Sequence, residues 1–287
     1  AKNAVLNVAS ASQQQGKINL RLPLLANQSL NLVNQGASIN SQAFVSIQPI
    51  ASWYTTDSST GNQHFDGIID PAGIYGADGK KLTNTINSSH QQFYGQTLAQ
   101  FIQQVNVDVS GWGDTANTEL RKVVDLVNPS LAINEGNITV LSHWNLAAQE
   151  NNQWLYRTEK GIAPILQLTA EKDIQLKASL SDGFQLANKV TLEKSAVVDP
   201  DAEPSTNPNN VDLDKALLGS QLSPTSLGLL TANLITGDSS SFNLWAKNGD
   251  IRLEGKELVK PSSTDNRSLA IPTMLRTGVG NIDLKAG

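Results

Sequence analysis

A short unit that recurs along the chain constrains its fold more than any other feature of the sequence. The unit is an apolar–polar–apolar triplet of the form Ile-x-Leu, and several copies follow a turn rich in Gly, Asn or Asp. Side chains alternate between the two faces of a strand, so the apolar residues point to one side and the polar residue to the other. The middle residue is polar in all five copies: Ile18-Asn19-Leu20, Ile138-Thr139-Val140, Ile174-Gln175-Leu176, Ile251-Arg252-Leu253 and Ile282-Asp283-Leu284.

The fullest copy of this unit lies between Ile165 and Phe184. Two alternating strand patterns there flank the polar turn Glu171-Lys172-Asp173, and the layout returns at 242–253 and at 275–284. One unit has too little apolar area to fold alone, so units must stack and share a continuous core. We therefore predict an all-β chain that folds as a parallel β-helix, with roughly 20–25 residues per coil and on the order of eight rungs. A β-sandwich with the same strand spacing is the alternative.

The composition agrees with β-structure and excludes several functions. Charged residues make up 16% of the chain, against about 25% in typical domains, so the polar surface must come from Asn, Gln, Ser and Thr. The net charge of −5 and the lack of a basic block argue against a nucleic acid or an anionic membrane as partner. The chain has no cysteine, which excludes disulfides, thiol catalysis and zinc–thiolate sites. No apolar run approaches the roughly 20 residues of a transmembrane helix, so we expect no membrane span.

The repeat is interrupted twice along the chain. One interruption contains a helix face at Leu98, Phe101, Ile102 and Val105, and a weaker helix candidate over 120–127, whose valines are poor helix formers. The other is rich in Asp, Pro, Asn and Ser, a composition typical of an exposed loop. The predicted organisation is β-helix coils over 1–52, a loop-rich, partly helical insertion packed on the shaft over 53–130, coils over 131–193, an exposed excursion over 194–226 and coils over 227–287.

Both ends of the chain suggest that it continues. The first residues, Ala-Lys-Asn-Ala-Val-Leu, have neither an initiator Met nor the layout of a signal peptide. The last residues, Lys285-Ala286-Gly287, directly follow a strand pattern. We expect both ends to be cuts in a longer protein.

Three segments of the C-terminal half carry a resemblance to a known family. They are Gly136–Leu146, with the sequence GNITVLSHWNL; Leu166–Phe184, which ends in Leu-Ser-Asp-Gly-Phe; and Leu275–Leu284, with the sequence LRTGVGNIDL. Each resembles a segment of filamentous haemagglutinin family exoproteins, the secreted partners of bacterial two-partner secretion, and the three occur in the same order as in that family. The part of the chain before Leu131 is similar to the family only in style.

This resemblance implies a fold, a place and a role. The fold is a right-handed parallel β-helix in the interior of a very large adhesin, which is secreted and displayed on the bacterial cell surface. The role is that of a non-catalytic shaft, which gives reach and rigidity for attachment to host cells or other bacteria, as in virulence. The implied partners are a cell-surface receptor or glycan and, during secretion of the parent protein, an outer-membrane transporter.

Aromatic side chains concentrate in the predicted insertion, and they are the candidate binding residues. They could form the small core of the insertion, packed on the shaft. Alternatively they could form a surface that binds a receptor or carbohydrate, because exposed aromatic side chains on a rigid scaffold are efficient anchors. The seven candidates are Trp53, Tyr54, Phe65, Tyr75, Phe93, Tyr94 and Trp112.

Metal and catalytic sites are not indicated, and we predict no cofactor and no enzymatic activity. His64 and Asp66 lie near Asp57 and Asp70, but their spacing matches no ligand motif, and His143 is interpreted as a surface residue. The acidic residues of the excursion could bind Ca²⁺, but they lack the repeated Gly/Asp pattern of calcium-binding β-rolls: Asp199, Asp201, Asp212 and Asp214. A polysaccharide-acting β-helix enzyme is a less favoured alternative, because it needs converging carboxylates and those of this chain are dispersed. The chain also has no Gly-x-Ser-x-Gly motif for a catalytic serine.

Overall fold

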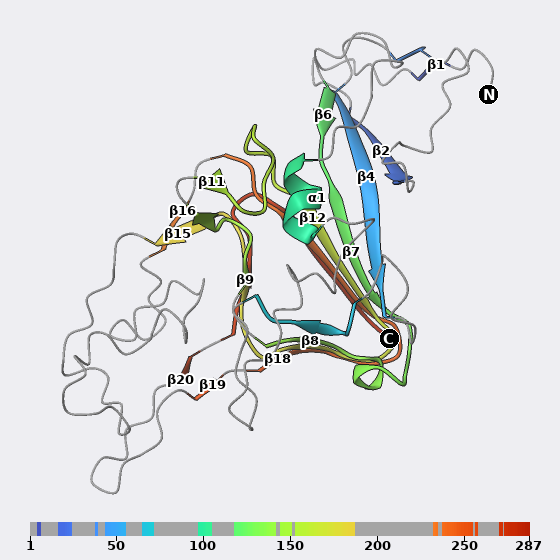
Figure 1. Cartoon of the computed structure of the whole chain (residues 1–287), viewed down its shortest axis with the longest axis vertical. Coiled ribbons are helices and arrows are strands. Elements are labelled where there is room, and N and C mark those ends of the chain that lie inside the picture. Colours follow the sequence, from blue (N-terminus) through green and yellow to red (C-terminus); the bar gives the residue numbers. More distant parts are fainter. Residues whose placement is uncertain are drawn as a thin grey trace, which may run out of the picture.

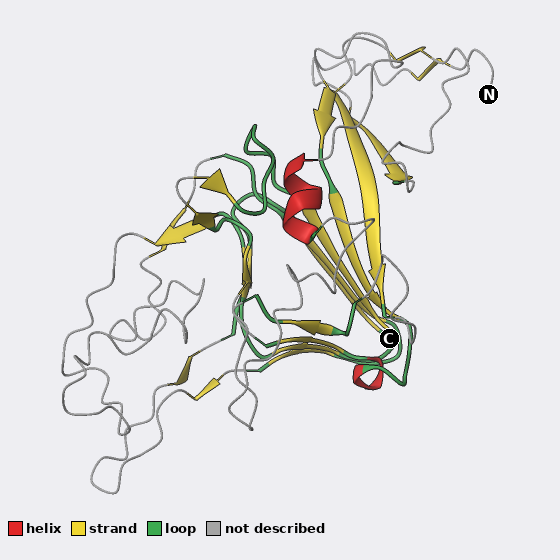
Figure 2. Cartoon of the chain, viewed as in Figure 1, coloured by secondary structure: helices red, strands yellow, loops and turns green. Residues whose placement is uncertain are grey.

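The computed structural model describes residues 5–6, 17–24, 38–39, 44–55, 65–71, 97–104, 118–141, 144–150, 153–186, 232–234, 237–254, 256–257, 270–271 and 273–287. Most regular elements in this part of the chain are β-strands (Figure 2). Its helices are α1 (Leu98–Gln104) and the one-turn 3-10 helix η2 (Asn134–Gly136). The chain is therefore all-β, as the sequence predicts.

A seven-stranded parallel sheet, called the large sheet below, forms one side of the molecule. β6 (Thr118–Leu120) pairs with the first half of β4, and β7 pairs with the second half, so β6 and β7 follow each other along the same edge. All neighbouring strands in this sheet are parallel. The main path through it runs through β2 (Lys17–Pro23), β4 (Phe44–Tyr54), β7 (Val123–Asn128), β12 (Ile165–Ala170), β17 (Ser241–Ala246) and β22 (Ile282–Ala286).

Two smaller parallel sheets complete the regular structure. The second sheet contains β18 (Ile251–Leu253), β13 (Ile174–Leu176), β8 (Ile138–Val140) and β5 (Ile68–Ile69), in this order. The third sheet contains β21 (Leu275–Arg276), β14 (Leu180–Ser181) and β9 (Trp144–Asn145). The chain visits the three sheets in turn, from β7 to β8 and β9, then from β12 to β13 and β14, and then from β17 through β18 and β21 to β22. Figure 1 shows the strands of the three sheets along three different sides of the molecule.

Four short strand pairs accompany these sheets in the described residues. One pair is parallel: β1 (Val5–Leu6) with β3 (Ser38–Ile39). The other three are antiparallel: β10 (Gln149–Glu150) with β11 (Gln153–Trp154), β15 (Phe184–Leu186) with β16 (Ala232–Leu234), and β19 (Lys256–Glu257) with β20 (Ala270–Ile271).

The strands pair in a register that places side chains of the same kind next to one another on neighbouring strands. Leu126, Leu168, Leu244 and Leu284 occupy one row across the large sheet. Ile138, Ile174 and Ile251 occupy one row across the second sheet. Inward-facing residues of all three sheets form one core cluster, which includes the large side chains of Trp53, Trp144 and Phe242. The apolar side chains of the triplets at 138–140 and 174–176 therefore belong to the shared interior, as the alternation requires. Leu253, Ile282 and Leu284 are instead 49%, 42% and 48% exposed.

Two details of the predicted repeat are wrong. The Ile282 and Ile18 triplets lie in the large sheet and the other three triplets lie in the second sheet, so the five copies are not equivalent. The chain also takes more residues than predicted to return to the large sheet, and the described main path has fewer strands than the predicted number of rungs. Stacking requires only that each new strand pairs in register with the strand before it. Longer connections between strands are tolerated, because the entropic cost of closing a loop grows slowly with its length. The number of residues that the chain uses between neighbouring strands of this sheet is the difference in residue number between paired Cα partners. One such pair for each two neighbouring strands is Lys17–Phe44, Ile50–Val123, Val123–Ile165, Ile165–Ser241 and Phe242–Ile282.

Helix α1 packs on the core, as its apolar face predicts. Thr97 and Gln100 form a capping box: the Gln100 backbone N–H donates to Thr97 Oγ1 (3.3 Å), and the Thr97 N–H donates to Gln100 Oε1 (2.8 Å). Phe101 is fully buried, and its ring meets that of Trp53 edge-on at 5.7 Å. Val105, the last residue of the predicted face, lies outside the described residues.

The second predicted helix is wrong, because its residues belong to strands β6 and β7. All six residues of β7 are buried, so its apolar side chains point to both faces of the sheet. Valine favours this environment because its branched side chain packs well on a pleated surface. Since β4 extends to Tyr54 and β7 spans 123–128, the large sheet includes both ends of the predicted insertion. The excursion at 194–226 lies outside the described residues.

The stack ends at β22 with an exposed strand. At the β22 end, Ile282 and Leu284 are 42% and 48% exposed, whereas Phe242 and Leu244, at the same positions one strand earlier, are 0% and 1% exposed. Among the described residues, no strand pairs with the outer edge of β22. The apolar row of the last strand is therefore open to solvent.

Candidate functional site

A polar groove crosses the outer face of the large sheet near the start of its strands. It has a volume of about 560 Å³ and extends from β2 to the residues before β22. Lys17 and Arg21 line it on β2, and apolar contributions come from Ile165 and Val279. The remaining side chains used below are Asn19, Gln48, Arg121, Asp238, Ser241 and Asn243.

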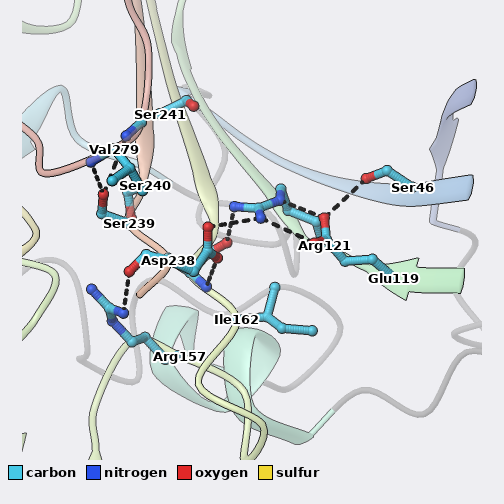
Figure 3. Close-up of polar contacts among 12 residues, drawn as sticks. Ser46, Glu119, Arg121, Arg157, Ile162, Asp238, Ser239, Ser240, Ser241 and Val279 are labelled. Carbon is cyan, nitrogen blue, oxygen red and sulfur yellow. Dashed lines mark hydrogen bonds and ion pairs between the residues drawn. The ribbon is translucent and has the colours of Figure 1, made fainter. Parts of the chain in front are cut away.

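Arg121 organises the middle of the groove. Its guanidinium donates to Glu119 from Nε (2.7 Å to Oε1) and to Asp238 from Nη2 (2.9 Å to Oδ1), and it also donates to the Ala163 carbonyl (3.1 Å). Figure 3 shows Arg121 between these two carboxylates. Burial alone would lower the pKa of Arg121, but the hydrogen bonds and charges of Glu119 and Asp238 outweigh this effect and raise it. The Arg121 guanidinium therefore remains charged and links the segments that precede β7, β12 and β17.

Asp238 connects this link to a second, buried ion pair. Its Oδ2 accepts from the Ala163 backbone N–H (2.8 Å), and its backbone carbonyl accepts from Arg157 Nη1 (2.6 Å). Arg157 Nη2 donates to Asp182 Oδ1 at 2.5 Å, and these two side chains are only 2% and 0% exposed. Asp182 also accepts from the backbone N–H groups of Gly183 and Ser240, at 2.6 Å each. We call each visit of the chain to the three sheets in turn a pass. Three consecutive passes are therefore joined beneath one end of the groove.

Serine side chains hold the last pass against the one before it. Ser239 Oγ accepts from the backbone N–H groups of Val279 (2.6 Å) and Gly280 (3.2 Å), as Figure 3 shows. Ser241 Oγ accepts from the Asn281 N–H (3.1 Å). These bonds fix the segment that forms the far wall of the groove.

A row of polar side chains runs along the large sheet from the groove. Ser52, Asp125, Gln167, Asn243 and Asp283 occupy equivalent outward positions on consecutive strands. Ser52 Oγ donates to Asp125 Oδ2 (2.9 Å), and Gln167 Nε2 donates to Asp125 Oδ1 (3.1 Å). Burial raises the pKa of Asp125 despite these two hydrogen bonds. Within the described part of the chain, the side-chain amide of Asn243 has no hydrogen-bond partner.

The next outward row carries two exposed aromatic side chains. Tyr54 is 40% exposed and Trp245 is 49% exposed. Val127 and Thr169 lie between them in the same row and are nearly buried. Lys247 Nζ lies 5.9 Å from the centre of the Trp245 ring. Trp245 follows Asn243 by two residues on β17, so both face outward beside the groove.

The structure separates the predicted aromatic candidates. Trp53 and Phe65 are 1% and 0% exposed and belong to the core cluster, so the binding role that we considered for them is corrected to packing. Their positions face inward, where a partner cannot reach them. Tyr54 is on the surface. The other candidates lie outside the described residues: Tyr75, Phe93, Tyr94 and Trp112.

The residues that were considered for a metal site are only partly described. Asp66 Oδ1 accepts from the backbone N–H of Ile68 (2.9 Å), and Asp70 is 1% exposed. In the described ranges, no group of three or more His, Asp or Glu side chains could hold a metal ion. The other residues considered lie outside these ranges: Asp57, His64, Asp199, Asp201, Asp212 and Asp214. His143, interpreted from the sequence as a surface residue, also lies outside them.

The groove contains one carboxylate among its described lining residues, Asp238, and Arg121 binds it. Glycosidases instead use two carboxyl groups on opposite sides of the scissile bond. Sequence reasoning missed both Arg121 and Asp238, because 117 residues separate them. The only local signal was the polar run Gly237–Ser241 before a strand pattern, which predicts a turn and no more.

In the residues that the structure describes, no helix is both long and apolar enough to cross a membrane. Comparison of the chain with protein-family models, curated proteins and solved structures gave no significant match in any of the three.

Proposed function

We propose that the chain folds as a right-handed parallel β-helix and acts as a non-catalytic shaft segment of a large secreted bacterial adhesin of the filamentous haemagglutinin family. In this role the segment gives reach and rigidity for the attachment of the parent protein to host cells or to other bacteria. The parent protein leaves the cell through its outer-membrane transporter partner and is displayed on the cell surface.

The observation that carries this proposal is the register of the parallel strands. Leu126, Leu168, Leu244 and Leu284 stack in one row although long connections separate consecutive members in the sequence. Parallel neighbours are about 4.8 Å apart, so the six strands of the main path span about 24 Å. A structure that grows by adding equivalent passes, each paired with the next, is a natural rigid spacer.

The family assignment has support from where the three resembling segments lie. Gly136–Leu146 contains β8 and β9, Leu166–Phe184 contains β13 and β14, and Leu275–Leu284 contains β21. β8 pairs with β13, while β14 pairs with both β9 and β21. The segments are thus neighbours in the stack, as equivalent coils of one shaft would be.

A chimeric exoprotein tests the proposed function. This chain would replace a stretch of interior coils in a filamentous haemagglutinin exoprotein, expressed with its transporter partner. A shaft segment should allow secretion, an unbroken filament in electron micrographs and adherence close to that of the parent. A β-sandwich domain of equal length, inserted at the same place, is the control and should interrupt the filament. Retention inside the cell, or a globular bead at the junction, would contradict the proposal.

A further inference from the structure

We propose that the polar groove and the adjoining Trp245 form a binding site for a neutral oligosaccharide. This inference deepens the proposed function, because it places recognition on the shaft itself instead of on an insertion. Only the role of the site in cell attachment rests on the proposed function. Binding itself does not, because the site is present in the isolated chain.

The first argument is the chemistry of the groove. Its walls present amide and hydroxyl groups from Asn19, Gln48, Ser241 and Asn243, carried on strands of one sheet. Gln48 Nε2 donates to Asn19 Oδ1 (3.4 Å), and Arg21 Nε donates to Gln48 Oε1 (3.2 Å), so these side chains are held in place before any ligand arrives. Planar amides with fixed donors and acceptors suit ligands with many hydroxyl groups. Side chains on rigid elements also lose little conformational freedom on binding.

The second argument is the position of Trp245. Its indole is 49% exposed, although large aromatic side chains normally bury most of their surface. Asn243 lies on the same face of β17, about 7 Å away along the strand, and its amide has no hydrogen-bond partner among the described residues. An exposed ring beside an unsatisfied amide is what a sugar requires, because the apolar C–H face of a pyranose stacks on the ring while its hydroxyls bind the amide.

The third argument is charge. Arg121 is neutralised by Glu119 and Asp238, and the nearby Arg157 is paired with Asp182. The centre of the groove, as far as its residues are described, therefore offers no free cation to bind a carboxylate, sulfate or phosphate. Lys17 and Arg21 lie on β2, at the end of the groove farthest from Trp245 along the strand order. Two lysines lie beside Trp245, and each has a carboxylate partner: Lys247 lies 3.7 Å from Glu171, and Lys285 lies 3.4 Å from Asp283. Because these charges are paired, the surface around β17 favours a neutral ligand over an acidic one.

The shape of the groove also favours a chain over a single sugar. The groove crosses the strands, whose spacing of about 4.8 Å is comparable to the length of one hexose unit. Its volume of about 560 Å³ is in the range of small-molecule binding sites. A short linear oligosaccharide can therefore place successive rings over successive strands.

A glycan array followed by titration tests this inference on the isolated chain. The array should contain neutral and acidic oligosaccharides from mammalian and bacterial surfaces, and at least one neutral glycan should bind. Titration of that glycan should change the tryptophan fluorescence of the chain. Trp245→Ala and Asn243→Ala should each weaken binding by roughly tenfold, in line with the worth of one aromatic contact and of one hydrogen bond, respectively. Leu131→Ala, which alters an exposed apolar residue away from the groove, should leave the affinity unchanged.

Three results would overturn the inference: no binding to any glycan on the array, binding of acidic glycans only, or neutral binding that both variants leave intact. Circular dichroism of each variant checks that its fold is retained, as expected for partly exposed positions. None of these results bears on the chimeric exoprotein, because a shaft without a glycan site would still support secretion and an unbroken filament.

Discussion

At the scale of single residues, buried charges join successive passes of the chain. Arg157 and Asp182 form a nearly inaccessible ion pair, and the Arg157 guanidinium also lies 4.6 Å from the centre of the Trp154 ring. Each oxygen of Asp182 accepts a backbone N–H in addition. A buried charge is tolerated when it is paired with an opposite charge, and it becomes destabilising when that partner is removed.

We expect Asp182→Asn to lower the free energy of unfolding by about 3–5 kcal/mol, because it leaves the Arg157 charge buried without a counter-ion. Urea denaturation measures the change. Asp283→Asn is the matched control, since Asp283 pairs with Lys285 (3.4 Å) on the surface and its loss should change stability by less than about 1 kcal/mol. Equal effects of the two substitutions would show that the Arg157–Asp182 pair does not hold the passes together.

Lys122 provides a pH-dependent test at the same scale. Its ammonium donates to the backbone carbonyls of Phe101 and Ile102 (2.8 Å each), at the last turn of α1. Burial lowers the pKa of Lys122 from 10.5 to about 8. Between these two values the unfolded chain binds a proton that the folded chain does not, so this group makes the folded state more stable as pH rises from about 8 to 10.5.

Urea denaturation of the natural chain and of Lys122→Met, measured from pH 7 to pH 10.5, should therefore show diverging stabilities. The difference should be constant below about pH 8 and should then shift in favour of the natural chain, by about 3 kcal/mol in total. Other groups titrate in both proteins and cancel in the comparison. Parallel stability curves would contradict a buried lysine with a lowered pKa.

At the scale of elements, close contacts between passes depend on particular turn residues. Gly183 has a φ of +79°, and a Cβ there would lie 2.6 Å from the backbone nitrogen of Gly278 on the next pass. Gly161 has a similar φ of +75°, but a Cβ there would have no neighbour within 4 Å. The two glycines therefore share the same backbone conformation and differ in the contact between passes.

Alanine substitution of these two glycines should separate backbone strain from stacking. Gly161→Ala should lower stability by about 1 kcal/mol, the strain of a left-handed residue. Gly183→Ala should lower it by about 3 kcal/mol, because it adds overpacking against Gly278. Thermal unfolding of both variants measures the difference. A smaller effect at Gly183 than at Gly161 would rule out the close approach of the two passes.

The elements also show what the sequence could predict. Alternating triplets such as Ile174–Leu176 and the helix face around Phe101 are local patterns, and both were predicted correctly. The apolar spacing at 120–127 fits a helix as well as a strand buried on both faces. The segment is a strand because β7 pairs with its neighbours in the large sheet, which the local sequence does not show. The groove could not be predicted, because its walls come from residues such as Arg121 and Asp238, and no local pattern encodes the length of the connection between them.

At the scale of the whole molecule, the central claim is an in-register stack of parallel passes. The large sheet brings Gln167 next to Asn243, and Asn243 next to Asp283, although long connections separate them in the sequence. A β-sandwich has no reason to place these three residues in one row. The proposed shaft depends on this row for its rigidity, and the proposed glycan site takes Asn243 from it.

Disulfide formation between introduced cysteines tests this claim most directly, because the natural chain has no cysteine. Neighbouring parallel strands place paired Cα atoms about 4.8 Å apart, within the range that a disulfide spans, whereas strands two apart are about 10 Å away. Mild oxidation of Gln167→Cys/Asn243→Cys should therefore give an intramolecular disulfide, and Gln167→Cys/Asp283→Cys should give none, as read by mass spectrometry. Failure of the first pair to form, or equal formation in both pairs, would contradict the stacked register.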